Sequence, residues 1–296
     1  MVFCSENPIF VKQKEFMKGI VMKKFYILLA AISLFTFVAC DKDKDNTPSE
    51  GNTEHKKIKT LIEYAEDGVS LISRTEYEYD EAGRIVGYKN YSYDKLTSER
   101  FDYQYTGASV TYTYKYEDRD ILSISKYKEI YTDEKFEKLK TQIQFDEDGD
   151  FERIRLEYEY NEKGIENGYK QYYNGNLMTE QFDYQFNGRT ITYITNDYFD
   201  GAISSTRKNK KVYTDITYEK IKTDIIYSPQ GTEEAKTEYD YDELGRLISS
   251  KTYHDDELRN ECVNFQYDDL TMTYTYNYYI EGSKVHTRNY TCIYYE

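Results

Sequence analysis

The stretch "TEYEYDEAGRIVGYKNY", residues 75–91, decides the fold. Tyrosine occupies alternate positions until Asp-Glu-Ala-Gly-Arg, residues 80–84, interrupts the run, and a second strand-like run follows. Alternation with period two is typical of a β-strand with two different faces, and so short an interruption predicts an antiparallel hairpin. Gly83 is expected in the left-handed region of the backbone, where a side chain would cost about 1 kcal/mol.

The same pattern returns along the chain at an offset of 81 residues: "YEYDEAGR" (77–84), "YEYNEKGI" (158–165) and "YDYDELGR" (239–246). A second set keeps the same offset: "FDYQYTG" (101–107), "FDYQFNG" (182–188) and "VNFQYDD" (263–269). Self-similarity at a fixed period indicates tandem structural repeats. We predict a β-repeat domain over 56–296, with repeats of about 56–136, 137–218 and 219–296, and we assign Gly83, Gly164 and Gly245 as structural turn residues.

Each repeat contains about six strand-like runs separated by short turns rich in Gly, Asp and Asn. Turns this short force neighbouring strands to run antiparallel. The expected fold is therefore all-β, an up-and-down meander of about 18 strands. Because strand-to-strand twist accumulates, the meander is expected to form a coiled single-layer sheet or an open, barrel-like sheet.

The alternation also assigns side chains to faces. Thr75, Tyr77 and Tyr79 share one face of their strand, opposite Glu76 and Glu78. By the same rule Phe101, Tyr103 and Tyr105 are expected to oppose Arg100, Asp102 and Gln104. One face is then aromatic and the other charged. A barrel that crosses an outer membrane needs a continuous apolar band toward lipid, so it is the less favoured alternative.

The segment "MKKFYILLAAISLFTFVAC", residues 22–40, is a short basic start followed by an apolar run and a small residue before cysteine. These features predict a cleaved secretion signal, with residues 1–21 as an upstream extension. Phe37–Cys40 resembles the lipobox of bacterial lipoproteins, which implies lipid attachment at Cys40 and a membrane anchor. Residues 41–55 are polar and charged, as expected of a flexible tether.

The sequence "CDKDKD", residues 40–45, resembles the export signal of Bacteroidota-type lipoproteins. The resemblance implies an outer-membrane lipoprotein exposed at the cell surface. The formal net charge of −15 argues against nucleic acid as a partner, because the protein and the nucleic acid would both be polyanions.

The stretches "YEYDEAGRIVGY" and "YDYDELGRLISS" resemble the YD or RHS repeat of bacterial surface proteins, whose unit is Tyr-x-Tyr-Asp-x-x-Gly-Arg-Leu. In the second repeat Asn161 and Ile165 replace the Asp and the Arg. The motif recurs far more often in that family than once per 81 residues. The resemblance implies a β-repeat architecture and an extracellular setting, and the toxin-shell function of the family is not carried over.

Residues typical of catalysis or metal binding are scattered. The three histidines, His55, His254 and His286, form no metal-binding pattern. "DEDGD", residues 146–150, is interpreted as a hairpin turn rather than a calcium loop. The 54 acidic residues mostly alternate outward on strands. Two carboxylates that are close in the sequence therefore do not identify a catalytic pair. We expect no catalytic residues, no metal and no cofactor.

Cys262 and Cys292 lie on predicted strands that are separated by one intervening strand. Their α-carbons are then about 9–10 Å apart, which exceeds the roughly 7 Å limit for a disulfide. Free thiols are predicted.

The favoured hypothesis is a non-enzymatic binding module for an extracellular glycan or a surface protein. Tyrosine offers a flat face for stacking and a hydroxyl group. The candidate ligand-facing residues are two adjacent pairs whose members must point to opposite faces: Tyr172, Tyr173, Tyr278 and Tyr279. A structural spacer or accessory subunit of an outer-membrane complex is the alternative, and a hydrolase using surface carboxylates is third.

Overall fold

The computed structural model describes residues 57–118 and 121–295, and within these ranges every regular element is a strand. The predicted upstream extension (1–21), signal (22–40), tether (41–55) and acylated Cys40 lie outside the described residues. The strands are β1 (Ile58–Tyr64), β2 (Leu71–Tyr79), β3 (Ile85–Ser92), β4 (Lys95–Thr106), β5 (Ser109–Asp118), β6 (Ile121–Tyr131), β7 (Leu139–Phe145), β8 (Glu152–Tyr160), β9 (Glu166–Tyr173), β10 (Asn176–Asn187), β11 (Thr190–Phe199), β12 (Ala202–Tyr213), β13 (Ile221–Tyr227), β14 (Glu233–Tyr241), β15 (Leu247–His254), β16 (Glu257–Tyr267), β17 (Thr271–Ile280) and β18 (Ser283–Tyr294).

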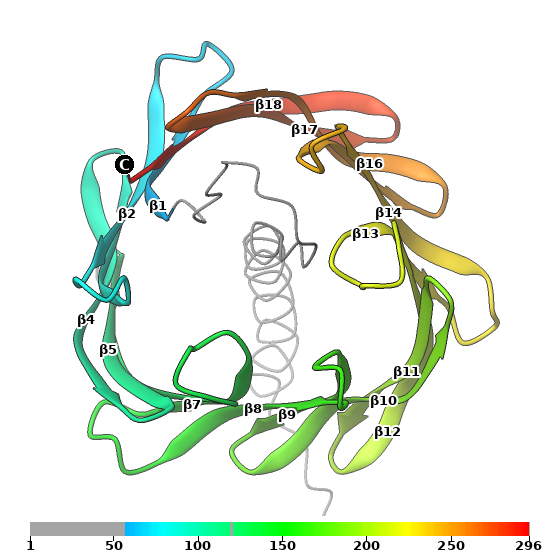
Figure 1. Cartoon of the computed structure of the whole chain (residues 1–296), viewed down its shortest axis with the longest axis horizontal. Coiled ribbons are helices and arrows are strands. Elements are labelled where there is room, and N and C mark those ends of the chain that lie inside the picture. The colour runs from blue at the N-terminus through cyan, green and yellow to red at the C-terminus, as the bar shows by residue number, and fades with distance from the viewer. Residues whose placement is uncertain (1–56, 119–120, 296) are drawn as a thin grey trace, which may run out of the picture. The chain divides into compact units, whose positions relative to one another are not determined.

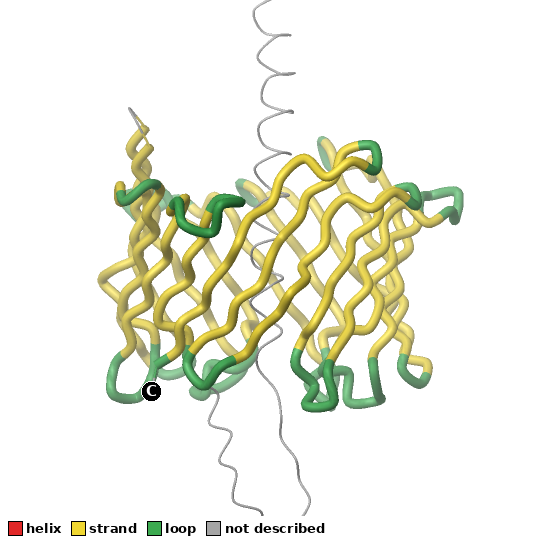
Figure 2. The backbone as a smooth tube through the Cα atoms, turned by 90° about the horizontal axis from the view of Figure 1, so that it is seen from above, coloured by secondary structure: helices red, strands yellow, loops and turns green. Residues whose placement is uncertain are grey.

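Each strand pairs antiparallel with the next one in the chain, and β1 pairs with β18 as well as with β2, so the 18-stranded sheet closes into a barrel (Figure 1). The strands are tilted relative to the barrel axis (Figure 2). The prediction of an all-β, up-and-down antiparallel meander is confirmed. The expected coiled or open, barrel-like sheet is a closed barrel, because β1 pairs with β18.

Strand lengths recur every six strands. They are 7, 9, 8, 12, 10 and 11 residues in β1–β6, then 7, 9, 8, 12, 10 and 12 in β7–β12, and 7, 9, 8, 11, 10 and 12 in β13–β18. The barrel therefore has two distinct ends. The terminal rim carries the connections after even-numbered strands, together with Lys57 and Tyr295, whose backbones are hydrogen-bonded at 2.9 Å. The hairpin rim carries the connections after odd-numbered strands.

The turn of residues 80–84 lies on the terminal rim and has the predicted form. The Gly83 amide donates to the Asp80 carbonyl at 2.8 Å, and the φ angle of Gly83 is +73°. A carboxylate oxygen of Asp80 accepts the Arg84 amide at 2.8 Å, and the Arg84 guanidinium donates back to Asp80. Gly164 and Gly245 have φ angles of +72° and +73° in the equivalent turns. The Asp and the Arg of the motif therefore close the turn together.

A β-bulge in β4 corrects one part of the predicted face assignment. Asp102 has a φ angle of +56°, and the register jumps between Phe101, opposite Thr113, and Gln104, opposite Thr111. Phe101 therefore lies on the opposite face from Tyr103. The bulge recurs at Asp183 and Asn264. The period-two rule failed here because an extra residue in one strand reverses the alternation without any interruption in the sequence.

Arg100 precedes this bulge and consequently lies on the tyrosine face. Its guanidinium carbon is 4.9 Å from the centre of the Tyr88 ring and 5.4 Å from that of Tyr112. The sequence prediction placed Arg100 on the charged face and was wrong.

The tyrosine face is the inner face of the barrel. The loops beside β7 and β13 fold inside the ring of strands (Figure 1), where Phe136 packs on Tyr105 and Tyr131 at 5.2 and 5.1 Å between ring centres. The buried side chains Val110, Tyr112, Ile191, Tyr193 and Tyr274 belong to this concave face, whereas the buried Ile225 lies on the outer face opposite Lys210.

The outer face carries a charged ladder at mid-strand. Glu76, Lys89 and Glu99 lie opposite one another on β2, β3 and β4. The same Glu-Lys-Glu order recurs as Glu157, Lys170 and Glu180, and again as Glu238, Lys251 and Glu261. Directly opposite side chains have Cβ atoms about 5 Å apart, so each Lys is flanked by a carboxylate on either neighbouring strand, and the Lys89 ammonium is ion-paired with the nearby Glu78 at 3.4 Å. The charged face that the alternation predicted is thus the outer side of the wall.

Eighteen strands, spaced about 4.8 Å apart and tilted by about 40°, give a ring roughly 36 Å across between backbones. The described side chains of opposite walls cannot meet across this width, and barrels with about this number of strands enclose an aqueous channel. The inner tyrosines therefore form a wall one side chain deep rather than a filled core.

Candidate functional site

The inner wall is built around one tyrosine in each group of six strands. Tyr112 on β5, Tyr193 on β11 and Tyr274 on β17 are 4, 7 and 9% exposed. Each stacks on at least one neighbouring ring, with Tyr112 and Tyr127 5.1 Å apart between centres and nearly parallel. Burial raises the pKa of all three phenols, to about 12 for Tyr193. These tyrosines define three inner sectors, which we call the first (β4–β7), the second (β10–β13) and the third (β16–β18 with β1).

The first sector surrounds its tyrosine with charge and amide groups. Glu129 accepts hydrogen bonds from the Tyr112 hydroxyl at 3.0 Å, from the Tyr131 hydroxyl at 2.7 Å and from the Gln142 amide at 2.8 Å. The Arg100 guanidinium lies over Tyr112 on the other side. A half-buried carboxylate with three donors is fully satisfied, so this sector is rigid and polar.

The second sector has the same positions filled differently: Gln181 replaces Arg100, Lys211 replaces Glu129 and Asp224 replaces Gln142. The ammonium of Lys211 lies 5.5 Å from the centre of the Tyr193 ring. The pKa of Lys211 is raised well above its usual value, first by the phenol of Tyr193 and then by Asp224, while burial opposes the shift. Burial raises the pKa of Asp224, with Lys211 acting against it.

The third sector is apolar. Cys262, Cys292 and Leu61 occupy these positions and pack with Tyr274 and Phe265. Both cysteines are buried and free, and β17 lies between their strands as predicted, so the free-thiol prediction is confirmed. Burial raises the pKa of Cys262 to about 11 and that of Cys292 to about 12.

The predicted ligand-facing tyrosines lie near the hairpin rim, and in each pair the members face opposite sides. Tyr173 and Tyr278 point inward and are 52 and 38% exposed. Tyr172 points outward beneath Arg155, whose guanidinium carbon is 4.4 Å from the ring centre, and the outward Tyr279 donates to Glu261 at 2.6 Å. The pairs lie on β9 and β17, which are far apart around the ring, so the structure does not bring them together.

Sequence reasoning did not find the sector residues Arg100, Glu129, Lys211 and Asp224. The available signal was alignment of the repeats, in which Glu129, Lys211 and Cys292 occupy one column. Three such different residue types at one repeat position mark a place where the repeats have diverged. The bulges, which put Arg100 and its counterparts Gln181 and Cys262 on the inner wall, carry no such signal.

The predicted hairpin turn at 146–150 is also present. One carboxylate oxygen of Asp146 accepts the amides of Gly149, Asp150 and Phe151 at 2.9, 3.1 and 3.3 Å. That oxygen is therefore occupied by the turn itself. Among the described residues, no group of three or more His, Cys, Asp or Glu side chains is arranged to hold a metal ion.

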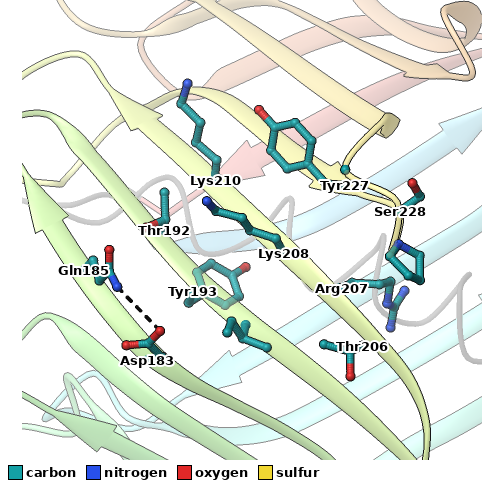
Figure 3. Close-up of a pocket in the computed structure, with 13 residues that line it drawn as sticks. Asp183, Gln185, Thr192, Tyr193, Thr206, Arg207, Lys208, Lys210, Tyr227 and Ser228 are labelled. Carbon is teal, nitrogen blue, oxygen red and sulfur yellow. Dashed lines mark hydrogen bonds between the residues drawn. The ribbon is translucent and has the colours of Figure 1, made fainter.

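The outer wall has a groove of about 670 Å³ across β10–β13, closed on one side by the loop that contains Ser228, Pro229 and Gly231 (Figure 3). Lys208, Lys210 and Tyr227 line it together with Gln185 and Thr192. These residues come from four strands, and register alone places them side by side.

No protein-family model matches this sequence, and no curated protein is significantly similar to it. Among solved structures, a porin-like protein from Bacteroides uniformis ATCC 8492 is similar, with a TM-score of 0.43 and 14% sequence identity over 80% of this chain and 96% of that chain. In the described part of this chain, no helix is long and apolar enough to cross a membrane.

Proposed function

We propose that the protein is a lipid-anchored, non-enzymatic surface lipoprotein whose barrel binds an extracellular glycan on its inner wall. The observation that supports this proposal is the divergence of the three inner sectors. Equivalent positions carry Arg100 and Glu129 in the first sector, Gln181 and Lys211 in the second, and Cys262 and Cys292 in the third. A wall that served only to hold the barrel together would have no need of three different chemistries around the same tyrosine.

The exposed inner tyrosines are the expected contact points. Tyr173 and Tyr278 stand near the hairpin rim, where a ligand entering the barrel meets them before the buried rings deeper in the wall. An aromatic ring stacks on the apolar face of a sugar while its hydroxyl bonds to water or to sugar hydroxyls. Capture of a protein instead of a glycan is the alternative outcome of the experiment below.

The charged outer ladder favours a barrel that lies outside the bilayer and is held there by Cys40. Glu76, Lys89 and Glu99 sit at mid-strand, as do their counterparts in the other two groups of strands. A Lys at the membrane midplane of a barrel costs about 2–4 kcal/mol. Planar-bilayer recordings of the purified protein are expected to show no channels, and Cys40→Ala is expected to move the protein from the membrane fraction to the soluble fraction.

Closure of the sheet disfavours the spacer alternative. A repeat protein gains length by adding units at its end. A barrel in which β1 pairs with β18 has no free end, so an added unit would widen the ring and not extend it.

The test is a glycan array probed with the purified protein, with a pull-down from outer-membrane extracts in parallel. Tyr173→Ala and Tyr278→Ala are each expected to weaken binding by about threefold to tenfold, the size of a lost aromatic contact. Tyr116→Ala is the matched control, because Tyr116 occupies the position of Tyr278 in another repeat. Binding that persists unchanged in both variants would exclude the inner wall as the ligand surface.

A further inference from the structure

Two lysines on the outer face have no acidic residue among their cross-strand partners. Lys208 and Lys210 alternate along β12 and point outward. Their register partners are Ile194 and Thr192 on β11 and Tyr227 and Ile225 on β13. Within residues 57–118 and 121–295, neither ammonium takes part in an ion pair or a hydrogen bond. They are unbalanced cations on a chain whose net charge is −15.

The side chains of both lysines line the outer groove described above. Figure 3 shows Lys208, Lys210 and the Tyr227 ring on the same side of the wall, with Thr192 and Gln185 farther along it. The one carboxylate in the lining belongs to the bulge residue Asp183, whose oxygen accepts the Gln185 amide at 3.5 Å. The groove thus joins these two lysines and the Tyr227 ring with several uncharged hydrogen-bonding groups, while Arg207, which also lines it, is ion-paired with Asp197 at 2.6 Å.

The equivalent surfaces of the other repeats lack this combination. In the first repeat Lys126 and Lys128 occupy the same positions, but the Lys126 ammonium donates to the Asp148 carbonyl at 2.8 Å, and the adjoining loop is the acidic "DEDGD". In the third repeat the positions hold Asn289 and Thr291. The loop beside Lys208 reads "SPQG", residues 228–231, and carries no charge.

We propose that this outer groove of β10–β13 binds an anionic saccharide chain that carries carboxylate or sulfate groups. The inference deepens the proposed function by naming a ligand class, and it adds a second site that is separate from the inner wall. Lys208 and Lys210 would each take one anionic group, since alternate residues of a strand stand about 7 Å apart. Tyr227 would stack on a sugar ring, and Gln185 and Thr192 would bond its hydroxyls.

The charge around the groove explains why the site would be selective. An anionic chain is repelled by most of an acidic protein and is drawn to a patch where two adjacent lysines have no acidic partner. Because the groove is open to solvent, this attraction is screened by salt, and binding is expected to weaken as ionic strength rises.

The experiment is affinity electrophoresis and titration calorimetry of the full-length protein with three probes: polygalacturonate, a sulfated glycan and uncharged dextran. Binding to an acidic probe, but not to dextran, is expected, and Lys208→Ala/Lys210→Ala should reduce affinity at least tenfold. The matched control Lys126→Ala/Lys128→Ala removes the same charge and should leave affinity within twofold. Ser228→Asp/Gln230→Asp gives the loop two of the three acidic residues of its first-repeat counterpart, residues 146–149, and should weaken binding with both lysines intact.

Equal loss in the two double-lysine variants, or no binding to either acidic probe, would overturn the proposal. Comparison of polygalacturonate with the sulfated glycan identifies which anion the groove prefers. If the lysine variants bind normally while Tyr173→Ala and Tyr278→Ala lose binding, the inner-wall function stands and the outer groove is excluded. If no glycan of any charge binds, both proposals fail.

Discussion

The guanidinium carbon of Arg84 lies 4.4 Å from the centre of the Tyr105 ring, while the same group is ion-paired with Asp80 at 2.7 Å. Arg246 lies over Tyr267 in the same way, at 4.6 Å. In the second repeat Ile165 and Phe186 replace both partners. The motif Asp-x-x-Gly-Arg is therefore one half of a contact whose other half is an aromatic residue two strands farther along the chain.

We predict that Arg84 and Tyr105 are energetically coupled. In a double-mutant cycle with Arg84→Ile and Tyr105→Leu, the coupling energy should be about 1 kcal/mol, as expected of a half-exposed cation–π pair. Urea unfolding of the four proteins provides the measurement. Arg259, which pairs with Glu257 on the outer face, is the control arginine. Purely additive effects in the cycle would show that the two residues act separately.

Gly83 is required for two separable reasons. Its φ angle is +73°, and a Cβ atom at this position would meet the ammonium end of the Lys57 side chain. Gly201 has a φ angle of +76° but nothing within 4 Å of such a Cβ. Gly201→Ala should therefore cost about 1 kcal/mol for the backbone alone, and Gly83→Ala should cost more.

Adding Lys57→Ala to Gly83→Ala should recover the steric part of the loss and leave the backbone part. Thermal unfolding of the single and double variants measures both parts. An equal loss of stability in Gly83→Ala and Gly201→Ala would mean that the lysine simply moves aside.

The bulge at Asp102 predicts an unusual order of substitutions for a mid-strand position. Asp102→Gly should be nearly neutral, because glycine adopts a φ of +56° freely. Asp102→Val, which a regular strand would favour, should destabilise the barrel by about 1–2 kcal/mol. The free energy of unfolding in urea distinguishes the two cases. A stabilising Val would show that β4 is regular at this point.

Cys262 and Cys292 should remain reduced and react slowly in the native barrel. Their pKa values of about 11 and about 12 leave little thiolate at neutral pH, and both side chains are buried. Labelling with a thiol reagent should be slow in buffer and fast in urea. A loss of about 2 Da by intact mass, without added oxidant, would reveal a disulfide and contradict the prediction.

The inner tyrosines should make the barrel sensitive to alkali. Burial raises the pKa of Tyr79, Tyr103, Tyr127 and Tyr160 to about 12 each, from an ordinary value of 10.0. Their neutral forms are favoured in the folded state, so this stability is fully present below pH 10 and falls as the pH rises toward 12. Urea midpoints at successive pH values, read beside the phenolate absorbance, test the prediction. A constant midpoint up to pH 12 would contradict it.

The strands and their turns could be predicted because both depend on local sequence. Tyr77 and Tyr79 reveal the period of the strand, and Gly83 marks the position that needs a positive φ. The antiparallel order followed from the shortness of the turns. These signals recur in every repeat and reinforce one another.

The inner wall and the outer groove could not be predicted because they depend on register. Asp102 reverses the alternation of β4 without looking unlike its neighbours, so Arg100 was assigned to the wrong face. Lys208 and Tyr227 become neighbours only through the pairing of β12 with β13. Closure required a pairing between β1 and β18, residues at opposite ends of the described chain, and no local pattern encodes it.

The backbone hydrogen bond between Tyr295 and Lys57 makes the barrel a candidate for circular permutation. A short linker could join the two residues, and the loop of residues 132–138 could be opened to provide new ends, with every strand keeping its neighbours. The same adjacency makes closure cooperative. Removing β18 would uncover the edges of β1 and β17 together, so the ring is expected to unfold in a single step rather than repeat by repeat.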